Sequence, residues 1–352
     1  MFNKKTALAA GFAVLAASAT NAAESWNPTL DQIQSQFIIP KYEAMTQSAQ
    51  QLAESVESLC TTPDASHLAK SQKAFRDNVA DWQTIQWLNF GPVTYFMRYY
   101  AYEYWPDKKG VTQRQLRALS ASPNMMEAPK FWSSASIAVR GMTAIESLLF
   151  HPDFDVVNRN SDCEVLEAVT RHHVTTSADV LKQWRESQAT DWVFAEEGDN
   201  TSLDHMVVEQ FVQQWLEHMS VVKDAKLETP IGYNSRPNLK LAEFYRSEQS
   251  LSSIQTNLKS YRVLYHSGSP SLYDTAITEQ PELAVALENA LADNVKIALQ
   301  LPDDFFTGDY SQEERVNLAK PLVKSISNSQ TQLTNLVTAL GFQIGFNSRD
   351  GD

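Results

Sequence analysis

The chain has 352 residues, of which 43% are hydrophobic, and a formal net charge of −13 at pH 7. An acidic balance of this size opposes binding to nucleic acids and long polyanions, because repulsion must first be overcome. It leaves cationic ligands, including metal ions, as the easier partners. Beyond the N-terminus no apolar stretch is long enough to span a bilayer, so the mature protein is not expected to be membrane-spanning.

Residues 1–22 have the pattern of a secretory signal peptide. Lys4 and Lys5 precede an apolar run, and Thr20 and Ala22 occupy the small-residue positions of a cleavage site. The alternative is an uncleaved anchor, for which the run is too short. No cysteine lies near the cleavage point, so the sequence does not support lipid anchoring. Removal of two lysines and no acid would bring the charge to −15 (−13 minus 2).

The sequence has two cysteines, Cys60 and Cys163. In an oxidising compartment an even pair is a candidate disulfide. The alternative is two buried thiols, which behave as small apolar side chains. The expected compartment favours the bridge.

Apolar residues recur at three-four spacing along most of the chain, with almost no strand-like alternation. This spacing gives a helix one apolar face to pack in a bundle. It predicts an all-α fold with eight long helices, at about 42–59, 65–90, 131–150, 162–187, 202–228, 240–266, 281–300 and 316–340.

A polar stretch at 188–200 divides these helices evenly, and Thr201 or Ser202 offers an N-cap for the next helix. The mature length suits two domains. We therefore expect two antiparallel four-helix bundles packed side by side, at 23–190 and 191–352.

Residues 82–106 are crowded with aromatic side chains, and Gly91-Pro92 must end a helix there. A bundle loop would be shorter and more polar. We expect an aromatic-rich insertion at 91–130 that lies across the first bundle or between the two. Its rings could stack on sugars, but packing is favoured because aromatic burial is a large hydrophobic term.

The stretch RGMTAIESLLF at 140–150 places Gly141 and Glu146 in an apolar segment that is predicted to be helical. Glycine inside a helix costs about 1 kcal/mol relative to alanine. Gly141 therefore suggests close approach by another backbone or ring. Glu146 either has a cationic or hydrogen-bonding partner in the interior, or lies at the helix edge and reaches water.

Residues 140–150, together with WLNFGPV at 87–93, EFYRSEQSL at 243–251 and GFNSRDGD at 345–352, resemble the imelysin-like proteins. These are exported bacterial proteins with a Gly-x-His-x-x-Glu motif on a helix. The resemblance covers essentially the whole mature chain and is greatest to the branch described as predicted periplasmic lipoproteins. It implies a periplasmic location, although this chain lacks a lipidation cysteine.

The family motif carries over as Gly141 and Glu146, but Thr143 stands at the histidine position. A hydroxyl is a poor ligand for zinc, copper or iron compared with imidazole. The sequence also has no His-Glu-x-x-His or His-x-x-Glu-His pattern, so it shows no set of three protein ligands for a catalytic zinc. The metallopeptidase activity proposed for the family is therefore disfavoured here.

The resemblance implies a site between the two bundles, in which Glu146 meets Arg246 and Ser247, with Gly141 and Thr143 beside it. The same contact could instead serve only to lock the bundles together. Because family members are linked to iron uptake, we expect a non-enzymatic protein that binds a small ligand or a metal ion there, iron or another divalent metal, with Glu146 as candidate ligand. The alternatives are a metal-dependent peptidase and a scaffold for an outer-membrane uptake component.

Two further metal sites can be considered. Asp350 and Asp352 lie in the C-terminal tail and could supply oxygen ligands to a hard cation, or could simply be solvated. His205 and Glu209 are four residues apart on a predicted helix and could share a ligand, although such isolated pairs are more often surface groups.

Overall fold

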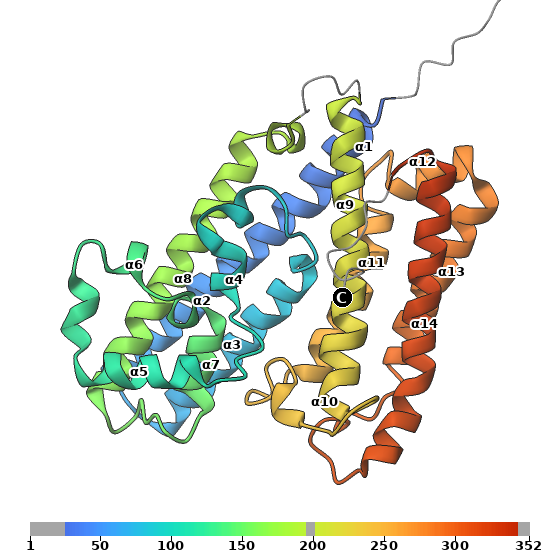
Figure 1. Cartoon of the computed structure of the whole chain (residues 1–352). Helices are drawn as coiled ribbons and strands as arrows, with labels where there is room; N and C mark the ends of the chain where they lie inside the picture. The colour runs from blue at the N-terminus through green and yellow to red at the C-terminus, as the bar shows by residue number, and fades with distance from the viewer. Residues whose placement is uncertain (1–24, 195–200, 344–352) are drawn as a thin grey trace, which may run out of the picture.

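The structure is a computed structural model, which describes residues 25–194 and 201–343. Within these ranges all regular structure is helical, which confirms the predicted all-α class. Two groups of long helices lie side by side, one built from the N-terminal half and one from the C-terminal half (Figure 1). No helix of the described ranges combines the length and the hydropathy needed to cross a membrane. The predicted signal peptide, the acidic linker residues 196–199 and the C-terminal tail lie outside these ranges.

The N-terminal group is centred on a helix that runs from residue 27 to residue 61. It packs against the two long helices that follow it in this half, and its apolar stripe, which includes Leu52, Val56 and Leu59, is fully buried. A short loop follows this helix. Asp64 in that loop caps the next helix and accepts a hydrogen bond from the backbone N of His67 at 2.8 Å. The elements of this group are α1 (Asn27–Ile33), the π-helix η1 (Gln34–Ile38), α2 (Ile39–Thr61), α3 (Ala65–Ile85), α7 (Met142–Phe150) and α8 (Asn160–Glu186).

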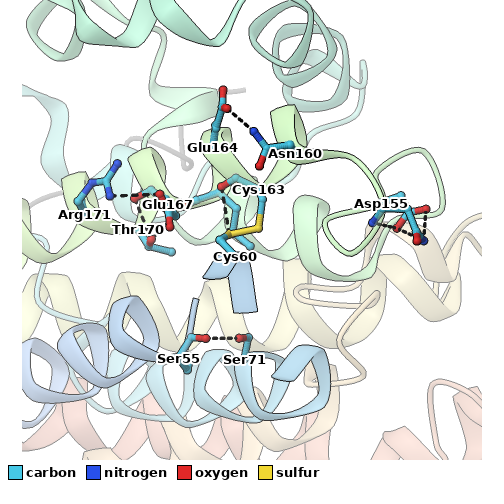
Figure 2. The surroundings of a disulfide bond; sticks show 12 residues. Ser55, Cys60, Ser71, Asp155, Asn160, Cys163, Glu164, Glu167, Thr170 and Arg171 are labelled. Carbon is cyan, nitrogen blue, oxygen red and sulfur yellow. Dashed lines mark hydrogen bonds and ion pairs between the residues drawn. A yellow bond between two sulfur atoms is a disulfide. The ribbon is translucent and has the colours of Figure 1, made fainter. Parts of the chain in front are cut away.

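A disulfide joins Cys60 at the end of α2 to Cys163 in the first turns of α8, with 5.6 Å between the Cα atoms (Figure 2). The predicted bridge is therefore present. It closes a loop with a sequence separation of 103 residues. In the chain-entropy model a loop of this length contributes about 4–5 kcal/mol to stability.

The C-terminal group begins with another long helix, whose N-cap is Ser202. Its last helix, α14, starts with a capping box in which Ser311 and Glu314 exchange hydrogen bonds. The groups meet where α3 contacts α11 and where α1 contacts α9. The elements are α9 (Leu203–Ser220), the π-helix η6 (Val221–Glu228), α10 (Thr229–Ile231), the 3-10 helix η7 (Leu239–Leu241), α11 (Ser250–Tyr265), α12 (Leu272–Glu279), α13 (Pro281–Ala298) and α14 (Gln312–Ala339).

The aromatic-rich segment after α3 reaches both groups. Its α5 packs against α7 and α8, whereas the indole Nε1 of Trp105 donates a hydrogen bond to the backbone O of Leu241 at 3.0 Å. The segment thus contacts both groups of helices, and its description as an insertion at 91–130 stays a prediction. The short elements here and before the linker are η2 (Gly91–Met97), α4 (Arg98–Tyr102), α5 (Val111–Ala121), η3 (Pro123–Glu127), α6 (Phe131–Ser134), η4 (Ile137–Val139) and η5 (Ala189–Trp192).

Two predicted helices are wrong in part. The helix expected at 131–150 is interrupted, and only α7 is a helix of more than one turn; Gly141 is the extended residue before it. The helix expected at 240–266 begins only at Ser250, because Phe244 and Glu248 take positive φ angles of 51° and 61°. The polar side chains of Glu243 and Ser247 in the irregular segment 242–249 are buried. The domain boundary at residues 190 and 191 stays a prediction.

Candidate functional site

Gly141 lies where the backbone of the aromatic segment crosses the start of α7. A Cβ atom built at this residue would lie 2.1 Å from the backbone O of Ala101 and 2.5 Å from that of Tyr102. No side chain fits at such distances. The close backbone approach predicted from the sequence is present, although the glycine precedes the helix and does not lie inside it.

Glu146 projects from α7 into the contact between the two groups of helices and is 3% exposed. Its Oε1 accepts two hydrogen bonds from Ser247, one from the backbone N at 3.0 Å and one from Oγ at 2.8 Å. Its Oε2 lies 3.6 Å from Nη1 of Arg246. Burial raises the pKa of the Glu146 carboxyl, and the hydrogen bonds from Ser247 and the charge of Arg246 oppose that rise. The three residues named from the sequence are thus in direct contact.

A pocket of about 210 Å³ lies beside this contact. Thr143 and Glu146 line it from the N-terminal half, and Arg246 and Lys240 line it from the C-terminal half, with Lys108 from the aromatic segment. The Thr143 hydroxyl donates a weak hydrogen bond to the backbone O of Tyr104 at 3.3 Å. Of the predicted site residues, Thr143, Glu146 and Arg246 border this cavity, whereas Gly141 and Ser247 do not line it.

The residues around Glu146 do not fit a bare metal ion. Both carboxylate oxygens already face donors, one toward Ser247 and the other toward a guanidinium group. A guanidinium repels a cation, and the Thr143 hydroxyl is a poor ligand. Throughout the part of the chain that the structure describes, no group of three or more His, Cys, Asp or Glu side chains is placed to hold a metal.

The second candidate metal pair has a packing role. His205 and Glu209 approach to 3.4 Å on α9, but the His205 ring stacks on Phe342 with 4.3 Å between centroids. Glu209 accepts a hydrogen bond from the backbone N of Gln343 at 2.7 Å. The pair therefore fixes the chain that follows α14. Asp350 and Asp352 lie outside the described residues.

The aromatic residues of the insertion divide into two sets. Trp82, Trp87 and Tyr102 are each 1% exposed and belong to the core, as the packing interpretation predicted. Tyr95 and Tyr100 are 45% and 52% exposed.

Sequence reasoning missed a buried polar network between the halves. Its centre is Lys226 on η6, a residue that is 1% exposed and whose ammonium forms an ion pair with Glu243 at 2.8 Å. The Nζ also donates to three amide oxygens at 2.6–2.8 Å, those of Gln83, Gln86 and Asn257. The π-helix places Lys226 there, and π segments are frequent at functional sites.

Gln86 connects this centre to further buried groups. Its amide Nε2 donates to Glu103 and to Glu243, both at 2.9 Å, so its Oε1 must accept. His218 Nε2, 3.1 Å from that Oε1, is therefore the protonated ring nitrogen, and His218 Nδ1 accepts from the hydroxyl of Tyr261 at 2.6 Å. Burial lowers the pKa of His218 well below its usual value, which keeps the ring neutral. Glu243 opens the EFYRSEQSL stretch, but that stretch alone does not show that its first residue is buried against Lys226.

The family model for imelysin (peptidase M75) matches residues 38–335. An imelysin-like protein from Psychrobacter arcticum 273-4 has a TM-score of 0.78 at 19% identity, covering 92% of this chain and 98% of that one. A candidate iron-regulated protein A precursor from Parabacteroides distasonis ATCC 8503 has a TM-score of 0.72 at 15% identity, with coverage of 92% and 97%. No curated protein matches the chain.

The family model spans more than half of the chain, and the chain belongs to the imelysin family. The two solved structures share its fold. The family resemblance seen in the sequence is confirmed, and the branch within the family stays a prediction.

Proposed function

We propose that this protein is an exported, non-enzymatic member of the imelysin family that takes part in iron acquisition by binding a ligand between its two halves. The observation that carries the proposal is the pocket beside Glu146, which residues from both halves line. The family match and a structural neighbour named for iron regulation support the iron link. The N-terminal signal pattern and the disulfide, which is typical of oxidising compartments, support a periplasmic location.

The charges at the pocket favour an anionic iron chelate over a bare ion. Arg246 is held over the ring of Tyr245, and its Nε has no hydrogen-bond partner among the described residues. Lys108 and Lys240, both exposed, line the same pocket. Three cationic side chains with unused donors can bind carboxylate oxygens of a chelator. The carboxyl groups of Glu103, Asp107 and Glu146 line the same pocket, so its formal charge is balanced, and the preference for an anion rests on the exposed Lys108 and Lys240 and on the unpartnered Nε of Arg246.

The replacement of the motif histidine by Thr143 supports a role without peptide hydrolysis. The pocket offers a hydroxyl, a hydrogen-bonded carboxylate and a guanidinium, and this set lacks the imidazole ligands of peptidase zinc sites. Incubation of the mature protein with unfolded protein substrates, with and without chelator, tests this part. Chelator-sensitive cleavage would contradict it.

Calorimetric titration of the mature protein with ferric citrate, and with citrate alone, tests the binding role. We expect binding of the chelate, weakened about tenfold or more by Arg246→Gln and by the double variant Lys108→Gln/Lys240→Gln, because each loses a charged contact. Lys182→Gln, an exposed lysine on α8, is the matched control and should bind as the unmodified protein does. Absence of binding, or equal affinity in all variants, would remove the proposal.

A further inference from the structure

A second, larger cavity lies next to the pocket beside Glu146 and is bounded mainly by aromatic rings. Its volume is about 330 Å³, within the range of small-ligand sites. The loop after α3, the α4 region and the α9–η6 helix form its walls. Tyr100, which is 52% exposed, lines the cavity and so places its mouth at the surface. The rings that line it belong to Trp82, Trp87, Tyr99, Tyr100 and Trp105.

Two carboxylate side chains line this cavity, Glu103 and Glu217, and of the two only Glu103 is buried. The residue is 7% exposed, and its Oε2 accepts hydrogen bonds from Trp82 Nε1 at 2.8 Å and Gln86 Nε2 at 2.9 Å. Its Oε1 is buried and accepts no hydrogen bond from the residues that the structure describes. In the free protein the Glu103 carboxyl is neutral and in hydrogen-bond contact with the Glu243 carboxyl; once Glu103 ionises, its Oε1 is an acceptor that is costly to bury unless a donor reaches it.

The nearest buried cation cannot supply that donor. The Lys226 ammonium has three protons, and four oxygen atoms, those of Gln83, Gln86, Asn257 and Glu243, already surround it at 2.6–2.8 Å. The cluster therefore holds two carboxyl groups, Glu103 and Glu243, but only one ammonium. His218 supplies no charge because its ring is neutral.

We propose that this cavity binds a small organic cation, a protonated primary amine. Its ammonium group donates to Oε1 of Glu103 and supplies the second positive charge that the cluster lacks. Its carbon atoms pack on the aromatic rings, whose faces also attract a cation. The indole Nε1 of Trp87 has no partner in the described ranges either, and it donates to an oxygen of the ligand. This cavity shares Glu103, Trp105 and Pro106 with the pocket at Arg246, but its proposed ligand is a cation and does not contact Arg246.

Binding of the amine is coupled to the release of a proton from Glu103. Burial, and then the charge of Glu243, raise the pKa of the Glu103 carboxyl, and the charge of Lys226 opposes them. The carboxyl therefore favours its neutral form in the free protein and ionises when the ammonium arrives, releasing a proton. The titratable groups that face it or line the cavity are Tyr99 and Tyr100 on α4, His218 and Glu217 on α9, Lys226 on η6 and Glu243 before α11.

Isothermal titration of the mature protein with tyramine, which carries an ammonium group and a hydroxyl, tests the proposal. We expect tyramine to bind about tenfold or more tightly than its neutral isostere tyrosol, because one charge-assisted hydrogen bond is lost. N-trimethylated tyramine, which has no N–H, should also bind more weakly. In buffers of different ionisation enthalpy the tyramine heat should reveal proton release, and affinity should rise with pH.

Variants test whether the preference for tyramine and the proton release arise at this cavity. Glu103→Gln should abolish proton release and the preference for tyramine over tyrosol, and Tyr100→Ala, at an exposed position, should weaken binding several-fold. Glu164→Gln, an exposed glutamate on α8, is the matched control and should bind as the unmodified protein does. If Glu103→Gln fails to fold, the Tyr100→Ala variant and the relative affinities of tyramine, tyrosol and N-trimethylated tyramine still test the proposal. No binding of tyramine, equal affinity for tyrosol or the trimethylated amine, or unchanged affinity in Tyr100→Ala would overturn the proposal.

Discussion

Lys226 of the π-helix η6 and Glu243 of the loop before α11 form an ion pair with 2.8 Å between Nζ and Oε2, and at most 1% of either residue is exposed. The amide oxygens of Gln83 and Gln86, from the N-terminal half, complete the ammonium's shell. A side chain of one half is therefore solvated by side chains of the other. This contact makes the interface between the halves part of the folded core.

Replacement of Lys226 by Met should destabilise the protein by about 3–5 kcal/mol, because breaking a buried pair leaves a carboxylate without its partner. Urea unfolding followed by circular dichroism measures the loss. The double variant Lys226→Met/Glu243→Gln removes both charges and should recover a part of it. A loss below about 1 kcal/mol in the single variant, as for an exposed pair, would contradict this role.

Gly141→Ala should cost several kcal/mol of stability, since the new Cβ would meet two backbone carbonyl oxygens at 2.1 and 2.5 Å and force α7 or α4 to move. Gly341→Ala is the matched control. Its Cβ would have nothing within 4 Å, and its φ of +87° alone predicts a smaller loss of about 1–3 kcal/mol. Thermal unfolding of both variants checks the order, and equal losses would argue against the steric account.

The free energy of unfolding should decrease as the pH falls, because the buried ring of His173 resists protonation. The ring is buried on α8, and Nε2 lies 2.9 Å from Asn78 Oδ1; burial lowers its pKa to about 3. Between pH 6.5, the ordinary pKa, and about 3 the unfolded chain binds one more proton at this position than the folded chain does. The contribution of the neutral His173 ring to the free energy of unfolding is therefore fully present above pH 6.5. Below pH 6.5 it decreases by roughly 1.4 kcal/mol per pH unit.

The comparison with His173→Gln isolates this group, because glutamine keeps a donor for Asn78 but does not titrate. The unfolding free energy of the variant should depend less steeply on pH between 6 and 4. Parallel curves for the two proteins would show that His173 does not titrate as proposed.

Removal of the disulfide by Cys60→Ser/Cys163→Ser should lower the unfolding free energy by about 4 kcal/mol, chiefly by freeing the unfolded chain. The far-ultraviolet circular dichroism of the folded variant should not change. Mass spectrometry after alkylation of the unreduced protein should detect no free thiol, and two alkylated cysteines would contradict the bridge.

The helices were predictable where one apolar stripe decides the structure. α2, α8 and α14 follow the three-four spacing because each buries a single face. The spacing failed at 131–141 and 242–249, where tertiary contacts dictate the backbone: Gly141 passes against two carbonyl groups, and positive φ angles at Phe244 and Glu248 turn Glu243 and Ser247 inward.

The Glu146 contact was predictable only from the family resemblance, which aligned two stretches that are 101 positions apart. The network around Lys226 could not be predicted. A single lysine in a helical pattern is normally predicted to be exposed to solvent. Nothing in the sequence indicates that this lysine is contacted by Gln83, Gln86, Asn257 and Glu243. These contacts depend on how two groups of helices pack.

The most direct test of the central claim is a crystal structure of the mature protein with ferric citrate, with iron located by anomalous scattering. The account predicts an iron peak in the pocket between the halves, with citrate oxygen atoms on Arg246 and Lys240. A peak at any other place, or none in crystals of protein that binds the chelate in solution, would contradict it.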